Sequence, residues 1–171
     1  MPAPVLIIRG APSAGKTTFA NKLRGTENAF IFETDNFFVD SINRRDYHFD
    51  PKLLGIAHSW NQGEVIRACR DCPDVPVIVA NTFSRPQEFQ PYFDIAKMFN
   101  RKIFVFTLYT EHEHNAHGVP EKTIQKYRDN MHVFYLDMWV NDYPIVYSLN
   151  INSDEEAAKV AQLAHLKIFE K

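Results

Sequence analysis

The sequence predicts an α/β fold: a doubly wound parallel sheet with a phosphate-binding loop (P-loop) and helices on both faces. Short apolar runs alternate with helical stretches, a pattern typical of a parallel sheet covered by helices. The first apolar run and the first helix enclose the pattern G-x-x-x-x-G-K-T, which is the P-loop signature in its proper strand-to-helix context. Its residues are Gly10, Ala11, Pro12, Ser13, Ala14, Gly15, Lys16, Thr17 and Thr18.

The remaining elements follow from hydrophobic periodicity. Strands are predicted at residues 5–8, 29–32, 75–80 and 102–108, and a weaker apolar run predicts one at 145–149. Helices are predicted from 17 to 23, from 51 to 70, from 120 onward and from 154 to 169. The last three carry apolar stripes that we expect to be buried. These are Leu53, Leu54, Ala57, Trp60 and Val65; Ile124, Tyr127, Met131, Phe134 and Met138; and Val160, Leu163, Ala164 and Ile168.

Each part of the P-loop has a predicted task toward a nucleoside triphosphate. Gly10 and Gly15 permit the close backbone approach that lets amide groups surround phosphate oxygens at a helix N-terminus. Lys16 is expected to reach the β- and γ-phosphates, and the Thr17 hydroxyl is expected to bind Mg²⁺. The loop therefore predicts ATP and Mg²⁺ as cofactors, held by residues 10–18.

Composition favours a single domain spanning residues 1–171. The chain is 45% hydrophobic and has fourteen phenylalanines, enough for one core. Its formal net charge of -2 argues against a broad surface for nucleic acid, so any such contact is expected to be local. Cys69 and Cys72 form C-x-x-C without a second ligand pair, and we interpret them as reduced thiols. Without a signal segment or membrane-length apolar run, we expect a cytoplasmic protein with no membrane partner.

Three segments are expected to gather around the P-loop, because the carboxyl ends of parallel strands meet at one edge of the sheet. These segments are residues 33–38, 81–85 and 109–114. Asp35 is a candidate general base, since a carboxylate facing the γ-phosphate can accept the proton of an attacking hydroxyl. On position alone, an aspartate that caps the next helix is an equal alternative.

Other P-loop classes fit less well. A GTPase needs Asp-x-x-Gly after a strand and Asn-Lys-x-Asp to bind the base, and the chain has neither. A motor ATPase would place an acidic residue after an apolar strand, where this chain has Asn81.

Several motifs together resemble polynucleotide-kinase-type P-loop phosphotransferases, from Leu6 to about Met131. They are Glu33-Thr34-Asp35-Asn36-Phe37-Phe38, Tyr47-His48-Phe49-Asp50, Ala57-His58-Ser59-Trp60-Asn61-Gln62, Val77-Ile78-Val79-Ala80-Asn81-Thr82 and Asn115-Ala116-His117-Gly118-Val119-Pro120. The resemblance implies that Asp35 is the general base for a hydroxyl acceptor. It also implies an acceptor lobe at about 36–72 and a helical lid at about 110–130.

The chain departs from that family at the third-strand motif and in the lid. Ala80 and Phe83 replace an Asp and a second Asn, and His114 stands where relatives carry an arginine. A histidine lacks the bidentate fork of arginine and is a weaker clamp on phosphate. Arg128 is the nearest basic alternative as a catalytic lid cation, and a solvated helix face is the competing interpretation.

Five residues are candidate acceptor contacts. Arg44 and Arg45 form a local basic pair suited to an acceptor phosphate, although exposed loop arginines are the alternative. His58, Asn81 and Thr82 lie in the family-like segments, and a histidine bonded inside the lobe is the alternative for His58. Zinc binding by the histidines of segment 111–117 is disfavoured because the spacing is not H-E-x-x-H.

The sequence thus predicts an ATP-dependent kinase that acts on a hydroxyl carried by nucleic acid. The hydroxyl is the 5′ end of DNA or RNA, or a hydroxymethyl group on a modified base in DNA. A kinase of a free nucleoside, nucleotide or small metabolite is the alternative. A nucleotide-binding module without transfer activity is a third interpretation, and no protein partner is evident.

Overall fold

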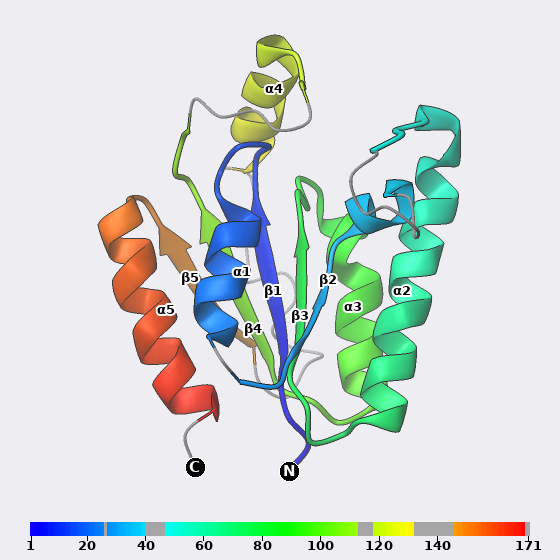
Figure 1. Cartoon of the computed structure of the whole chain (residues 1–171), viewed down its shortest axis with the longest axis vertical. Helices are drawn as coiled ribbons and strands as arrows, with labels where there is room; N and C mark the ends of the chain where they lie inside the picture. The colour runs from blue at the N-terminus through cyan, green and yellow to red at the C-terminus, as the bar shows by residue number, and fades with distance from the viewer. Residues whose placement is uncertain (26, 40–46, 113–117, 132–145, 170–171) are drawn as a thin grey trace.

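Five parallel strands form one sheet in a computed structural model of the chain, in the order β2-β3-β1-β4-β5 (Figure 1). The structure describes all residues except 26, 40–46, 113–117, 132–145 and 170–171. The strands are β1 Val5–Gly10, β2 Phe30–Phe32, β3 Val77–Asn81, β4 Ile103–Leu108 and β5 Val146–Ile151. All five predicted strands are confirmed, with ends shifted by one or two residues. The central strand, β1, pairs with both β3 and β4, so Val5 lies beside Val77 and Ile103.

Helices cover both faces of the sheet, which confirms the doubly wound fold. Helices α1 Lys16–Arg24 and α5 Asp154–Phe169 cover one face, and α2 Leu54–Asp71 and α3 Pro86–Met98 cover the other (Figure 1). Successive residues of β1 divide between two cores because strand side chains alternate in direction. Leu6 and Ile8 belong to the core that contains Phe19 of α1, whereas Val5 and Ile7 belong to the core that contains α2 and α3 residues.

Two short 3₁₀ helices and α4 lie beyond the sheet edge. The 3₁₀ helix η1, Thr34–Phe38, follows β2 directly, and η2, Pro51–Leu53, leads into α2. Helix α4, Glu121–Met131, lies past the carboxyl end of β1 in the region predicted as the lid (Figure 1). No helix in the described part of the chain combines the length and apolar character that a bilayer crossing requires.

The predicted apolar side of α2 is partly wrong. Ala57 and Val65 are buried as expected, but Leu53, Leu54 and Trp60 are between 37% and 38% exposed. The buried face consists of Ala57, Asn61, Val65, Ala68 and Cys69. Asn61 takes the core position because its amide donates to the Tyr92 hydroxyl of α3 at 2.7 Å. Hydrophobicity alone therefore predicted the buried face of α2 incorrectly. Of the exposed apolar residues, Leu54 lines the cleft described below.

Helix α3 was not predicted. Its two prolines, Pro86 and Pro91, conceal a helical pattern whose buried members are Phe89, Tyr92, Phe93 and Ala96. The start of the helix carries a readable signal, since the Arg85 backbone N–H donates to the Glu88 carboxylate at 3.2 Å. A proline at the first turn followed by an acidic residue is typical of a helix N-terminus.

The stripes of α4 and α5 are confirmed in part. Ile124 and Met131 of α4 are buried, while Phe134 and Met138 lie outside the described residues. In α5, Val160, Ala164 and Ile168 pack against the core, but Leu163 is 58% exposed and Ala161 takes the buried position. Cys69 and Cys72 are free thiols, as expected.

Arg101 ties together the sheet end opposite the P-loop. It is only 3% exposed, and its guanidinium donates to the carbonyl oxygens of Ala3, Cys69, Cys72 and Val75 at 2.9 to 3.1 Å. Two of these carbonyls lie at the end of α2, where helical carbonyl groups have no partner within the helix. Arg101 therefore joins the chain start, the α2 end and the entry to β3.

We expect Arg101→Met to lower the free energy of unfolding by about 3 kcal/mol, because several buried carbonyls lose a charged donor together. Urea denaturation of both proteins measures this difference. Arg67→Met is the matched control, since the Arg67 side chain is 62% exposed and pairs with the neighbouring Glu64 on the same helix. Equal stability of the two variants would contradict this role for Arg101.

Candidate functional site

The P-loop runs from Gly10, the last residue of β1, to Lys16, the first residue of α1. Both glycines are required by the local packing. A Cβ on Gly10 would meet the Leu108 carbonyl oxygen at 3.0 Å, and Gly15 has a φ of +79° with His112 Nε2 at 3.2 Å from its Cβ position. Any side chain at either position would displace the neighbouring strand or loop. The loop thus brings successive backbone amides to the N-terminus of α1, the arrangement that binds phosphate.

Lys16 is partly buried at the base of this loop. Its Nζ donates to the carbonyl oxygens of Gly10 at 3.0 Å and Ala11 at 2.9 Å. Burial lowers the pKa of Lys16 to about 8, while the charges of Asp35 and Glu33 act in the opposite direction. The ammonium group is therefore poorly hydrated and faces two carboxylates.

Glu33 is a site residue that sequence reasoning did not single out. It follows the end of β2 directly, and its carboxylate accepts a 2.7 Å hydrogen bond from the Thr17 hydroxyl. The signal for Glu33 was its position at the carboxyl end of a predicted strand, the same signal that indicated Asp35 two residues later. Glu33 orients the hydroxyl that the P-loop signature assigns to Mg²⁺.

Asp35 lies in the first turn of η1 and borders the same cleft as Lys16. It accepts a hydrogen bond from the Tyr47 hydroxyl at 3.3 Å. Burial, together with the nearby Asp35 charge and this bond, raises the pKa of Tyr47 to about 12. Tyr47 therefore remains a donor to Asp35 at neutral pH. Sequence reasoning missed this contact because the two residues lie twelve positions apart and meet through the fold.

Asn81, Thr82 and His58 all line the cleft and also hold its segments together. The Asn81 side-chain oxygen accepts from the Thr34 backbone N–H at 2.8 Å. The Thr82 carbonyl accepts from the Gly10 N–H at 3.3 Å, and the Thr34 hydroxyl lies 3.4 Å from His58 Nδ1. Among the described residues, the buried amide nitrogen of Asn81 has no hydrogen-bond partner. Asn81 thus keeps one donor available at the cleft.

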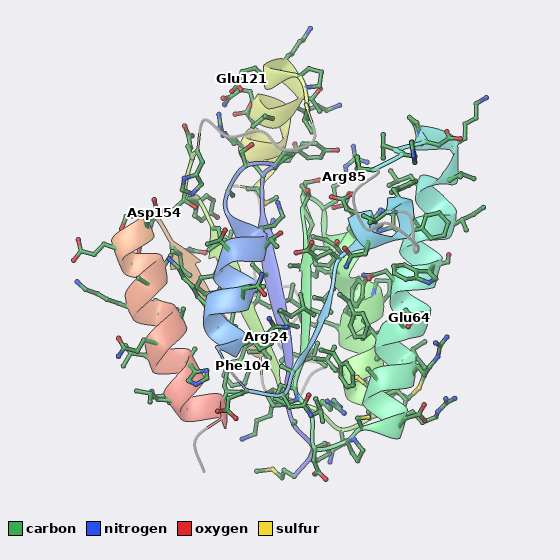
Figure 2. The ribbon with its side chains drawn as sticks, viewed as in Figure 1. Arg24, Glu64, Arg85, Phe104, Glu121 and Asp154 are labelled. Carbon is green, nitrogen blue, oxygen red and sulfur yellow. The ribbon has the colours of Figure 1, made fainter. Side chains whose placement is uncertain are left out.

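A cleft of about 930 Å³ joins these groups. It is lined by most of the P-loop, by residues 33–35 after β2, by 80–83 at the end of β3, and by residues that follow β4. The predicted gathering of three distant segments is confirmed for these positions. Figure 2 shows the same end of the molecule, with Asp154 on α5, Arg85 after β3 and Glu121 on α4 all lying toward it.

A histidine and a carboxylate form a pair at the end of the cleft next to β4 and β5. His112 Nε2 lies 3.3 Å from Asp154 Oδ1 at the start of α5, and the nearby Thr110 hydroxyl donates to the Ala14 carbonyl at 2.7 Å. The segment after β4 is therefore fastened directly to the P-loop. Sequence reasoning considered His112 only for zinc, and no group of three or more potential metal-binding side chains is found within the described ranges.

The remaining sequence candidates lie elsewhere or outside the described residues. Arg128 is not among the residues described as lining the cleft, and it pairs with Glu121 at 3.0 Å and Glu111 at 3.3 Å. Its neighbours Thr123 and Tyr127 do line the cleft. Arg44 and Arg45 lie outside the described residues, as does His114.

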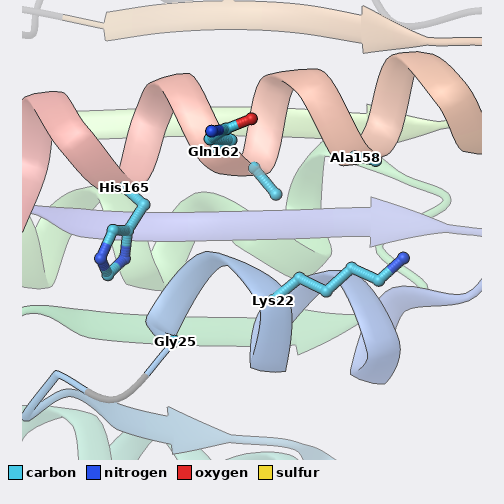
Figure 3. Close-up of a pocket in the computed structure, with 6 residues that line it drawn as sticks. Lys22, Gly25, Ala158, Gln162 and His165 are labelled. Carbon is cyan, nitrogen blue, oxygen red and sulfur yellow. The ribbon is translucent and has the colours of Figure 1, made fainter.

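A second, smaller hollow of about 250 Å³ lies between α1 and α5 (Figure 3). Lys22, Gln162 and His165 line it together with small residues, and His165 Nδ1 lies 2.9 Å from the Leu23 carbonyl oxygen. It contains no P-loop residue, so the larger cleft is the candidate active site.

Comparisons with known proteins agree with this geometry. Over 100 residues the chain is 33% identical to NEDD4-binding protein 2 of Homo sapiens, a match that covers 58% of this chain and 5% of that protein. The chain therefore spans only a small fraction of that relative's length.

Solved structures share the fold at low sequence identity. A tunicamycin resistance protein from Deinococcus radiodurans aligns with a TM-score of 0.61 and 15% identity, covering 99% of this chain and 97% of that one. A gluconokinase from Sinorhizobium meliloti aligns with a TM-score of 0.62 and 11% identity, covering 99% and 94%. Kti12 from Chaetomium thermophilum, in complex with ADP-AlF3, aligns with a TM-score of 0.58 and 14% identity, covering 96% and 99%.

These likenesses identify the α/β fold as that of P-loop kinases. The model of an AAA domain family, AAA_33, matches residues 5–132, which include the P-loop, η1, α2, β3 and all of α4. The chain therefore belongs to the AAA_33 family of AAA domains.

Proposed function

We propose that the chain transfers the γ-phosphoryl group of ATP to a hydroxyl carried by nucleic acid, with Asp35 as general base. The acceptor is the 5′-hydroxyl of DNA or RNA, or a hydroxymethyl group on a modified base in DNA. The observation that carries the proposal is the placement of Asp35 in the same cleft as Lys16, close enough for their charges to interact. A carboxylate opposite a phosphate-binding lysine can orient and deprotonate an attacking hydroxyl.

The step forms a bond between the acceptor oxygen and the γ-phosphorus and breaks the bond from that phosphorus to the β,γ-bridging oxygen. The acceptor proton passes to the Asp35 carboxylate, and ADP leaves. Tyr47 donates to Asp35 and so helps to orient the carboxylate toward the acceptor. Lys16 and the loop amides offset the negative charge on the phosphates during transfer.

The residues present fit a magnesium ion. Mg²⁺ prefers oxygen ligands, and the Thr17 hydroxyl donates its proton to Glu33, so the oxygen lone pairs remain available to the cation. Bound there, the ion would neutralise charge on the β- and γ-phosphates.

The order of the strands in the sheet supports binding of the phosphate donor and of the acceptor at opposite ends of the cleft. Asp35 and Tyr47 lie on the β2 side of the P-loop, whereas His112 and Asp154 lie on the β4 and β5 side. A triphosphate whose γ-phosphate faces Asp35 would extend its nucleoside toward His112 and Asp154. The acceptor would then enter between η1, α2 and the end of β3, where Asn81 offers its buried amide donor.

Two further assignments stay predictions. Arg128 would act as the lid cation only if its guanidinium group left Glu111 and Glu121 and bound phosphate oxygens instead. Arg44 and Arg45 remain the predicted contacts to an acceptor phosphate, and His58 and Thr82 the predicted contacts to the acceptor itself.

A kinase of a small molecule is the second candidate. It is favoured by the likeness of the fold to a gluconokinase and by the slightly negative net charge of the chain. The third candidate is a binding protein rather than an enzyme: a module that binds nucleotide without transferring phosphate. The altered third-strand and lid motifs favour it.

The pKa of Lys16 gives nucleotide binding a pH dependence. Because burial lowers this pKa to about 8, Lys16 is charged below that pH and loses its charge as the pH rises through it. Affinity for a non-hydrolysable ATP analogue should be constant near pH 7 and fall above about pH 8, by up to about tenfold per pH unit. Calorimetric titration across this range measures the effect. Lys16→Met should bind weakly with a flat profile, and a flat wild-type profile would contradict the assignment.

We expect Asp35→Asn to lower the transfer rate by about 10² to 10⁴, the range typical of a general base, with nearly unchanged ATP affinity. Steady-state transfer from labelled ATP and calorimetric ATP binding separate the two quantities.

Glu33→Gln is the matched control, since Glu33 lines the same cleft and also interacts with Lys16. It should weaken Mg²⁺-dependent ATP binding more than it lowers the rate. Tyr47→Phe should lower the rate in the wild-type background and have little further effect in Asp35→Asn, because residues in one hydrogen-bonded unit are not additive. A larger loss of rate in Glu33→Gln than in Asp35→Asn would assign the base to Glu33.

A further inference from the structure

The acceptor side of the cleft is bordered by half-exposed apolar side chains. The rings of Tyr47 and Phe49 line it together with Leu54. We call these three residues the aromatic wall, after its two rings. Phe49 is 49% exposed and Leu54 is 38% exposed, although most large apolar residues of the chain are buried. Exposed apolar groups grouped at a cleft mark a binding surface more often than a folding requirement.

The wall is held in place from behind. The Phe38 ring is only 5% exposed and meets the Phe49 ring at 5.1 Å and 65°, and the Tyr47 ring at 6.2 Å and 73°. A β-bridge between Val39 and Tyr47 and the 2.9 Å bond from His48 N–H to the Phe38 carbonyl fix the backbone. Tyr47 and Phe49 consequently present nearly parallel rings, 8° apart. Little side-chain freedom remains to be lost on binding.

The wall begins beside the reacting centre. The Tyr47 hydroxyl lies 3.3 Å from Asp35 Oδ1, so an acceptor whose hydroxyl reaches Asp35 has its neighbouring atoms against Tyr47 and Phe49. The part of the acceptor next to the attacking oxygen would therefore lie against the wall.

Charge narrows the kind of group that the wall accepts. Among the described residues lining the cleft, the lysine and arginine side chains are Lys16 and Lys22, and both belong to α1 on the P-loop side. The Tyr47 hydroxyl already donates to Asp35, and His58, which also lines the cleft, lies against Thr34. Beside the wall, a carboxylate would thus find no lysine or arginine among these described residues, whereas a planar uncharged ring would find matching flat surfaces.

We propose that the aromatic wall is a stacking site for the nucleobase next to the reacting hydroxyl, and that it selects base-carrying acceptors over sugars and acids. The inference rests on the proposed function, since it assigns Asp35 to the acceptor hydroxyl. Base-on-aromatic stacking contributes about 1–3 kcal/mol per base, or about 5- to 150-fold in affinity.

Binding without turnover tests the site in the full-length Asp35→Asn chain. The probe is a short single-stranded oligonucleotide with a free 5′-hydroxyl and 2-aminopurine as its first base, whose fluorescence falls when the base stacks. A matched probe carries an abasic first residue, and its binding is followed by anisotropy through a distant dye. We expect quenching with the first probe and about 5- to 150-fold weaker binding of the abasic one.

Added in this background, Phe49→Ala should weaken binding of the base-carrying probe by a similar factor and leave the abasic probe unchanged. Phe49→Trp should retain binding. Ile56→Ala is the control, because Ile56 is 57% exposed on α2 and does not line the cleft. Equal binding of the two probes, or an equal effect of Phe49→Ala on both, would overturn the stacking site.

Transfer assays separate this inference from the proposed function. Phe49-dependent binding of the base-carrying probe, without phosphoryl transfer by the chain that retains Asp35, would support the wall and contradict the kinase proposal. Efficient transfer that ignores both the first base and Phe49 would support the kinase and overturn the wall.

Discussion

A single buried ammonium group organises the candidate site. Lys16 is held between two loop carbonyls and faces Glu33 and Asp35 in a setting that lowers its pKa. A poorly hydrated cation interacts strongly with phosphate, because fewer water molecules compete for it. The glycines, the Thr17–Glu33 bond and the end of β2 all contribute to keeping this charge at the cleft rather than in water. In the proposed function, phosphate binding and acceptor activation would therefore share one electrostatic centre.

The polar residues around that centre are both structural and chemical. Asn81 fastens the start of η1 to the end of β3, and thereby sets where Asp35 lies relative to Lys16. Thr110 fastens the segment after β4 to the P-loop. Neighbouring strands supply these contacts because their carboxyl ends meet at one edge. The position of the proposed base thus depends on a hydrogen bond from the end of a neighbouring strand.

Periodicity and the P-loop signature were sufficient to predict the strands, the fold and the meeting of distant segments. They failed where a polar group replaced an apolar one in the core, as with Asn61, and where prolines interrupted a helical pattern, as in α3. Tyr47 and Glu33 were missed for another reason: their importance lies in contacts with Asp35 and Thr17 that local sequence does not encode. The Tyr47-His48-Phe49-Asp50 motif was visible in the sequence, but the exposure of Phe49 at the cleft follows only from the fold.

The central claim is that this cleft transfers phosphate from ATP to a hydroxyl on nucleic acid. The most direct measurement is transfer from γ-labelled ATP to a panel containing oligonucleotides with free 5′-hydroxyls, DNA with hydroxymethylated bases, free nucleosides, gluconate and shikimate. The account predicts labelled nucleic acid, with little label on the two acids, and loss of that label in Asp35→Asn. Label on gluconate, shikimate or free nucleosides at equal or higher efficiency would contradict it and assign the cleft to a small-molecule kinase.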